Sequence, residues 1–67
     1  MHVFDASSIL YAWDNYPIEK FPPLWDWMAQ QVTGRQFVIS KIAFDEVKHK
    51  APDCGKWLEV NNVQRLA

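Results

Sequence analysis

Asp5 is the first residue in this chain whose position suggests chemistry. It follows a short apolar run and precedes small hydroxyl residues and then a helical pattern, an order that predicts a buried strand followed by a helix. In open α/β sheets ligands gather outside the carboxyl ends of the strands, so we expect Asp5 to face the crevice where a site would be built. The alternative is that Asp5, Ser7 or Ser8 caps the following helix through a side-chain oxygen.

Glu46 is the second acidic candidate. It lies four residues after Ile42 and three after Ala43 in a predicted helix, a spacing that turns its side chain toward the apolar side. A buried carboxylate is costly unless a cation or hydrogen bonds compensate for its charge, and a metal ion is one such partner. The alternative is an ordinary surface ion pair between Glu46 and Lys50, four residues further on.

The pattern of apolar residues and helix breakers predicts the elements that position these acids. Proline and glycine residues bound the predicted helices, and a β-branched and aromatic run indicates a second strand. We expect a first strand up to Asp5, a helix from about residue 7 to Pro17, a helix from Pro22 to Gly34, a strand at 36–40, a helix at 41–50 and a short helix after Pro52. Residues 63–67 begin a further pattern that is too short to assign.

These elements predict an α/β fold in which a small parallel sheet of about two strands is combined with three or four helices, all within one domain of residues 1–67. Strands joined by a long helical crossover run parallel, so their carboxyl ends lie at the same edge. Asp5 and the start of the 41–50 helix are therefore expected at that edge.

Composition narrows the class of protein. The chain has 49% hydrophobic residues, a net charge of −1 and a single cysteine, Cys54. This balance gives no electrostatic footprint for tight, sequence-independent nucleic-acid binding. A lone cysteine excludes an internal disulfide and favours a reducing cytoplasm, and it is more often a small buried hydrophobe than a nucleophile. No stretch approaches the roughly 20 apolar residues of a membrane span.

Four segments together resemble the beginning of PIN-like proteins: residues 3–10 (Val-Phe-Asp-Ala-Ser-Ser-Ile-Leu), 22–25 (Pro-Pro-Leu-Trp), 37–40 (Phe-Val-Ile-Ser) and 44–48 (Phe-Asp-Glu-Val-Lys). The resemblance covers nearly the whole chain. It is closest to an uncharacterised PIN-like branch found in bacterial toxin–antitoxin operons.

The resemblance implies a site and an activity. Asp5 matches the first acid of the family, Ser7 the hydroxyl that follows it, and Glu46 the acid on the helix after the second strand. In the family such acids help to bind Mg²⁺ or Mn²⁺, and the metal ion supports hydrolysis of RNA. PIN domains are about twice as long, however, and take their remaining acids from later elements. The chain therefore matches an N-terminal half-domain with half of the expected acidic cluster.

Two hypotheses about function follow, together with a weaker third one. The chain is either a truncated PIN-like ribonuclease toxin or a catalytically inert module that self-associates or binds an antitoxin protein. A sheet with so few strands has open edges that invite pairing, so we predict a homodimer. The third hypothesis is a purely helical protein-interaction domain.

Overall fold

The computed structural model describes residues 2–67 and has an α/β fold with four helices and three parallel strands. Its elements in chain order are β1 (His2–Phe4), α1 (Ala6–Asn15), α2 (Pro22–Thr33), β2 (Phe37–Ser40), α3 (Lys41–Lys50), α4 (Pro52–Val60) and β3 (Gln64–Leu66). The predicted fold class is confirmed, and the helical interaction domain is excluded by the sheet.

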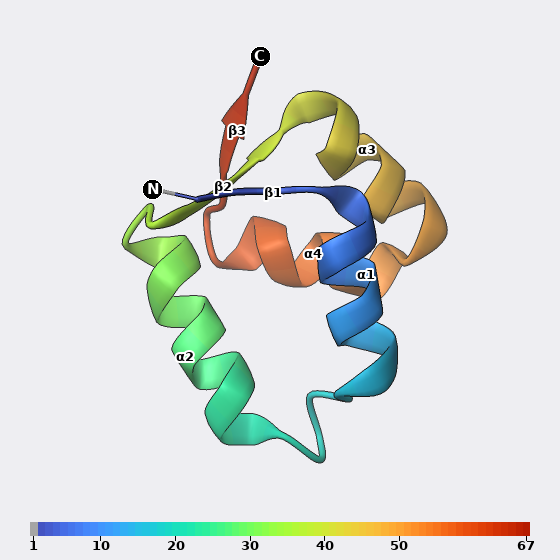
Figure 1. The fold of residues 1–67 in the computed structure, drawn as a ribbon, viewed down its shortest axis with the longest axis vertical. Helices are drawn as coiled ribbons and strands as arrows, with labels where there is room; N and C mark the ends of the chain where they lie inside the picture. Colours follow the sequence, from blue (N-terminus) through green and yellow to red (C-terminus); the bar gives the residue numbers. More distant parts are fainter. Residues whose placement is uncertain (1) are drawn as a thin grey trace.

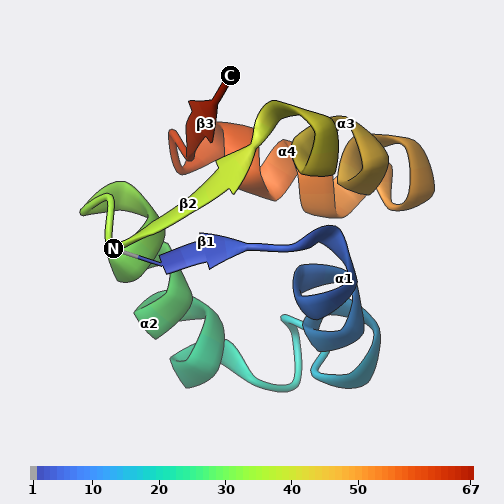
Figure 2. The ribbon, with the colours of Figure 1, turned by 45° about the horizontal axis from the view of Figure 1, so that its top comes forward.

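The sheet has the order β1-β2-β3, so β2 is the central strand (Figures 1 and 2). In the parallel register Phe4 lies beside Ile39, and Ile39 lies beside Arg65. The two crossovers, from β1 to β2 and from β2 to β3, advance in the same direction along the sheet. Because such crossovers are right-handed in nearly all proteins, both sets of helices lie on the same face of the sheet. The carboxyl ends of the three strands form a single edge.

The third strand is the main addition to the predicted fold, which had about two strands. Asn62 adopts a left-handed backbone conformation with φ 57°, a conformation that asparagine tolerates better than most residues. The Val63 N–H then donates to the carbonyl of Leu58 at 3.0 Å, which ends α4 and turns the chain back along β2. The sequence pattern cannot show this strand because it has only three residues, two of them polar.

The turn between α2 and β2 also depends on a left-handed residue. The predicted end of α2 at Gly34 is confirmed, but Gly34 has φ −79° and the left-handed position falls on Arg35, with φ 62°. The Gln36 N–H donates to the carbonyl of Gln31 at 2.9 Å, the bond expected of a helix that ends in this way. A non-glycine residue therefore occupies a position that favours glycine.

One hydrophobic core joins the helices to one face of the sheet. It contains Ile39 of β2 together with buried residues of all four helices, among them Ile9, Trp25, Phe44 and Leu58. On the opposite face of the sheet, Val3 is largely exposed.

Three tryptophans join three helices at one side of the core: Trp13 from α1, Trp25 from α2 and Trp57 from α4. The Trp25 and Trp57 rings are 5.1 Å apart, and the Trp13 ring is 5.3 Å from Trp25. The Trp25 indole N–H also donates to the carbonyl of Tyr16, which satisfies the polar atom of a buried side chain. This tryptophan cluster fixes α2 relative to α1 and α4.

Candidate functional site

Asp5 lies where the sequence places it, directly after β1 at the carboxyl edge of the sheet. Its Oδ1 accepts a hydrogen bond from the Ser8 N–H at 2.7 Å, so Asp5 is the N-cap of α1. Hydrogen bonding by Ser8, through its side chain first and its backbone second, lowers the pKa of Asp5 below its usual value. The carboxylate is exposed and held ionised, and the capping role offered as an alternative is the one observed.

The hydroxyl residues at this edge divide into two groups. Ser7 and Ser8 are exposed in the first turn of α1. Ser40 ends β2 and caps α3, because its Oγ accepts a hydrogen bond from the Ala43 N–H at 3.1 Å. Since Phe4 pairs with Ile39, Asp5 and Ser40 follow at corresponding positions of neighbouring strands. The edge therefore has a cap at the start of each of two helices.

Glu46 departs from the predicted orientation. Its side chain is 46% exposed, and its carboxylate lies 3.6 Å from the ammonium of Lys50, so the surface ion pair offered as the alternative is present. The prediction of an inward side chain is wrong because it takes Ile42 as part of the apolar side, and Ile42 is itself 84% exposed. The buried residues of α3 are Phe44 and Val47, which turn the face with Ile42 and Glu46 outward.

The structure brings the two acidic candidates to neighbouring elements rather than into one preformed cluster. The helices that carry Ser7 and Glu46, α1 and α3, pack against each other and both start at the carboxyl edge (Figure 1). Within residues 2–67 no three His, Cys, Asp or Glu side chains are close enough to hold one metal ion together. Asp5 thus lies exposed at the edge itself, and Glu46 lies exposed in the second turn of α3.

Cys54 is not part of any site. It is fully buried in the core, and desolvation, followed by the negative charge of Asp14, raises its pKa to about 12. A thiol in this state forms almost no thiolate at neutral pH. The predicted role of Cys54 as a buried hydrophobe is confirmed.

A further group of polar residues meets at α3 and β3. Lys41 and Lys48 of α3, together with Arg65 of β3, line a groove of about 430 Å³ around the ring of Phe44. The seven-residue spacing of the two lysines is a local signal of a shared helix face. Arg65 gives no such signal because it reaches the groove through the strand that the pattern does not reveal.

The fold and this edge define a class, that of small α/β proteins with a parallel sheet and polar residues at its carboxyl edge. Residues 2–67 match the family described as Domain of unknown function (DUF4411), and the chain belongs to that family. Neither the curated proteins nor the solved structures include a significant match to this chain. None of the helices in residues 2–67 is long and apolar enough to cross a lipid bilayer.

Proposed function

We propose that this chain is a PIN-like domain related to metal-dependent endoribonuclease toxins, with Asp5 and Glu46 as metal ligands and Ser7 beside them. The observation that carries the proposal is the position of Asp5. It is an ionised carboxylate directly after a parallel strand, at the edge where α3 also begins. The carboxyl edge of a parallel sheet is where α/β proteins place their sites.

The donor set fits Mg²⁺ or Mn²⁺ as a partial shell. Mg²⁺ is commonly held by one or two carboxylates and keeps several waters or substrate phosphate oxygens. Asp5 uses Oδ1 for the helix cap, and its carboxylate is exposed, so the group remains accessible to a metal ion. Glu46 must exchange its partner Lys50 for the metal ion. When bound, the ion would activate a water molecule and stabilise charge on the scissile phosphate.

The chain's own residues position the metal-binding groups and keep the Asp5 carboxylate charged. Ser8 fixes the Asp5 carboxylate and keeps it ionised, while the exposed Ser7 hydroxyl is free to donate to a phosphate oxygen or a water. Because Asp5 and Glu46 lie on different elements, their mutual placement depends on the packing of α1 against α3. With two carboxylates per chain, we expect weak metal binding that is strengthened by an RNA phosphate or by a second protomer.

The test is Mn²⁺-dependent cleavage of a mixed RNA pool by the purified chain, with molar mass recorded on the same samples. Asp5→Asn and Glu46→Gln should both abolish cleavage. Asparagine is as good a helix cap as aspartate, so the Asp5 variant keeps the fold. Glu19→Gln, which removes an exposed carboxylate from the connection before α2, is the matched control. Cleavage by the wild type that persists in both site variants would refute the proposed site.

Lys50 provides a second arm of the test. Because Lys50 competes with a metal ion for Glu46, Lys50→Gln should tighten Mn²⁺ binding measured by calorimetry. Lys20→Gln removes an exposed charge elsewhere and should leave the affinity unchanged. If neither Lys50→Gln nor Glu46→Gln changes the Mn²⁺ affinity, Glu46 is not part of the site.

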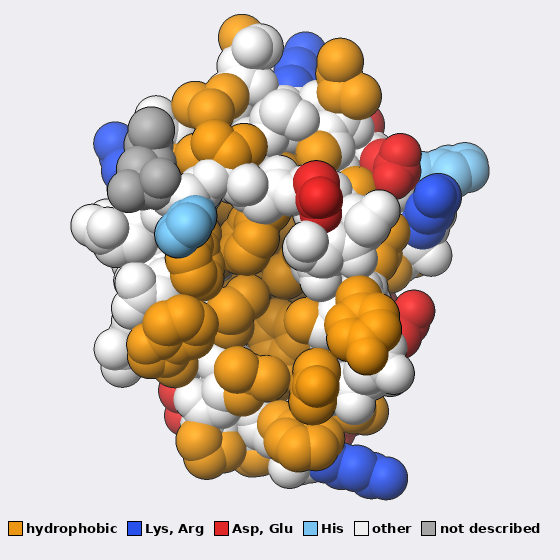
Figure 3. All heavy atoms as spheres, in the orientation of Figure 1, with side chains coloured by type: hydrophobic (Ala, Val, Ile, Leu, Met, Phe, Trp, Pro, Cys, Tyr) orange, Lys and Arg blue, Asp and Glu red, His pale blue; other side chains and the backbone are white. Residues whose placement is uncertain are grey.

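A second candidate function is that of an inert module that self-associates or binds an antitoxin protein. Hydrophobic side chains gather on the face between α1 and α2, where the surface is hollowed (Figure 3). Large apolar residues remain exposed in this part of the chain, including Tyr16, Phe21 and Trp27. Exposed apolar surface of this kind marks interaction sites in soluble proteins.

Light scattering tests this second candidate. A wild-type mass matching two chains, reduced to one chain by Trp27→Glu, would support association through the exposed apolar surface at Trp27. Ile42→Glu, at an exposed apolar position of α3, is the control and should leave the mass unchanged. A monomeric wild type at micromolar concentration would exclude the homodimer and leave a different protein as the partner.

A further inference from the structure

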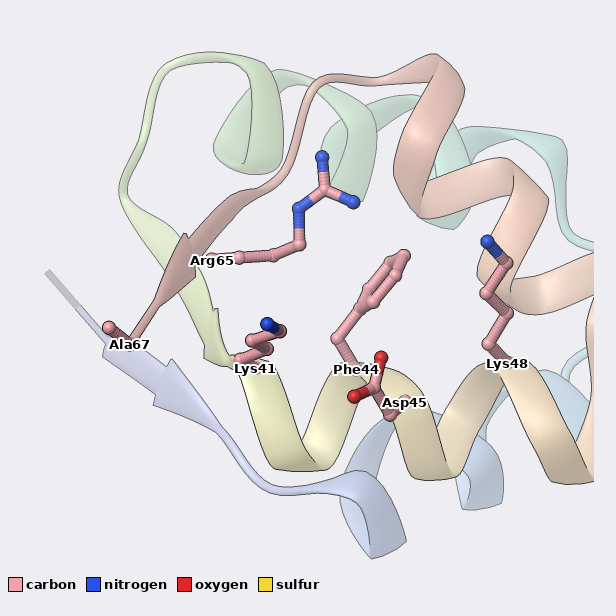
Figure 4. Close-up of a pocket in the computed structure, with 6 residues that line it drawn as sticks. All are labelled: Lys41, Phe44, Asp45, Lys48, Arg65 and Ala67. Atoms are coloured by element: carbon pink, nitrogen blue, oxygen red, sulfur yellow. The ribbon is translucent and has the colours of Figure 1, made fainter.

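A groove between α3 and β3 collects positive charge outside the Asp5 and Glu46 edge. It is lined by Lys41, Phe44, Asp45, Lys48, Arg65 and Ala67 and has a volume of about 430 Å³. Figure 4 shows the Arg65 side chain reaching over the Phe44 ring from β3, while Lys48 rises from α3 on the other side of the ring. Three of the chain's seven Lys and Arg residues therefore surround one aromatic side chain.

Phe44 holds two of these cations in place. The ring is only 3% exposed and is fixed in the core. The guanidinium carbon of Arg65 lies 4.7 Å from its centroid, and the Lys48 ammonium lies 5.7 Å from it. Cation–π contacts at such distances are attractive and limit the rotamers of long side chains. The two charged groups are therefore positioned before any ligand arrives.

The charges in the groove are only partly neutralised. Lys48 forms a salt bridge with Glu59 at 2.9 Å, and Asp45 supplies one carboxylate to the lining. Within residues 2–67 neither Lys41 nor Arg65 takes part in a salt bridge. An arginine has five N–H donors in a planar fork that matches a phosphate group, and its stacking on an aromatic ring leaves the edge of that fork available.

We propose that this groove binds a phosphate group through Arg65 and Lys41, with Lys48 adding charge from the far side of Phe44. The source that we favour is the backbone of an RNA strand, and this choice rests on the proposed function. Lys41 follows Ser40 at the end of β2, and Ala67 follows the last residue of β3. The groove thus adjoins the same carboxyl edge as Asp5, and an RNA strand along that edge would meet the groove and the acidic candidates in turn.

Binding is measured by fluorescence anisotropy with a short labelled single-stranded RNA in EDTA, so that neither metal binding nor cleavage contributes. Arg65→Gln combined with Lys41→Gln should weaken binding at least tenfold. It should also reduce the slope of log affinity against log salt by about 0.7, the contribution of one lost phosphate contact with a single strand. Lys20→Gln combined with Lys56→Gln removes two exposed charges outside the groove and should leave affinity nearly unchanged. Equal losses in both pairs would overturn the groove as the site.

Asp45→Asn provides a variant that should gain affinity, which damage to the fold cannot imitate. Removing this carboxylate from the groove should tighten RNA binding about fivefold, because one unit charge near a phosphate contributes about 1 kcal/mol at the surface. Unchanged or weaker binding in Asp45→Asn would contradict the proposal.

Inorganic phosphate distinguishes the sources of the ligand. If phosphate alone shifts the amide resonances of Lys41 and Arg65 at millimolar concentration and RNA binds no more tightly, the groove is a site for free phosphate groups and the choice of RNA is wrong. Binding in EDTA without Mn²⁺-dependent cleavage would retain the groove and reject the nuclease function. Cleavage without any effect of the Lys41 and Arg65 substitutions would reject the groove alone.

Discussion

Gly55→Ala tests how closely α3 and α4 must approach each other. A Cβ atom built on Gly55 lies 2.9 Å from the Cα of Lys48 and 3.0 Å from its Cγ, whereas carbon atoms in van der Waals contact are about 3.5 to 4.0 Å apart. The nearest atom belongs to the backbone of α3, so a change of side-chain rotamer cannot remove the clash. The two helices must separate by roughly half an ångström or more.

Two opposing effects determine how much Gly55→Ala changes the free energy of unfolding. Alanine in place of glycine inside a helix stabilises it by about 0.8 to 1.0 kcal/mol. Overpacking a close-packed contact costs about 1 to 3 kcal/mol. The expected result is a net loss of about 1 kcal/mol in the free energy of unfolding, or a melting temperature lower by about 4 to 8 °C for a domain of this size.

The assay is urea unfolding followed by circular dichroism at 222 nm, with thermal melts of the same samples. Lys56→Ala is the control, because Lys56 neighbours Gly55 on α4 but is exposed, and it should change stability by no more than about 0.5 kcal/mol. If Gly55→Ala stabilised the protein by about 1 kcal/mol, helix propensity alone would decide the outcome. The inferred close contact between α3 and α4 would then be refuted.

Three other predictions concern the backbone, the helix cap and the thiol. Arg35→Gly should raise the free energy of unfolding by up to about 1 kcal/mol, because it relieves a left-handed non-glycine residue; a loss of stability in urea melts would contradict this. Folding lowers the pKa of Asp5. The ionised carboxylate therefore stabilises the folded protein fully above the unfolded pKa, which is near 4. This stabilisation is lost as the pH falls through the lower pKa of the folded state. Asp5→Asn should flatten stability against pH below about pH 4, and an unchanged acid melting profile would show that the cap carries no such linkage. Cys54, buried with a pKa raised to about 12, should resist iodoacetamide at pH 8 until urea unfolds the chain, as measured by mass spectrometry; rapid labelling of the folded protein would disprove its burial.

The sequence predicts those features that depend on residues close together in the chain. It does not predict the features that depend on packing between distant segments. The order of strand, Asp5 and helix could be predicted because an acidic residue between an apolar run and a helical pattern favours the end of a strand and the start of a helix. The orientation of Glu46 could not, since its spacing was measured from Ile42, an apolar residue that the fold leaves exposed. β3 was missed for a related reason: its residues form a strand because β2 offers open hydrogen-bonding groups beside them. The Arg65 groove depends on that strand and was therefore missed with it.

The tryptophan cluster makes the assembly of three helices visible by spectroscopy. Because α1, α2 and α4 each supply one indole, and the rings lie 5.1 to 6.5 Å apart, the full coupled near-ultraviolet dichroism of the three rings requires all three helices to be in place. Trp27 is half-exposed and contacts Phe37 instead, so it contributes a separate, solvent-sensitive emission. The chain thus contains two optical signals without any label, one from the interior of the helical layer and one from the half-exposed Trp27 on α2.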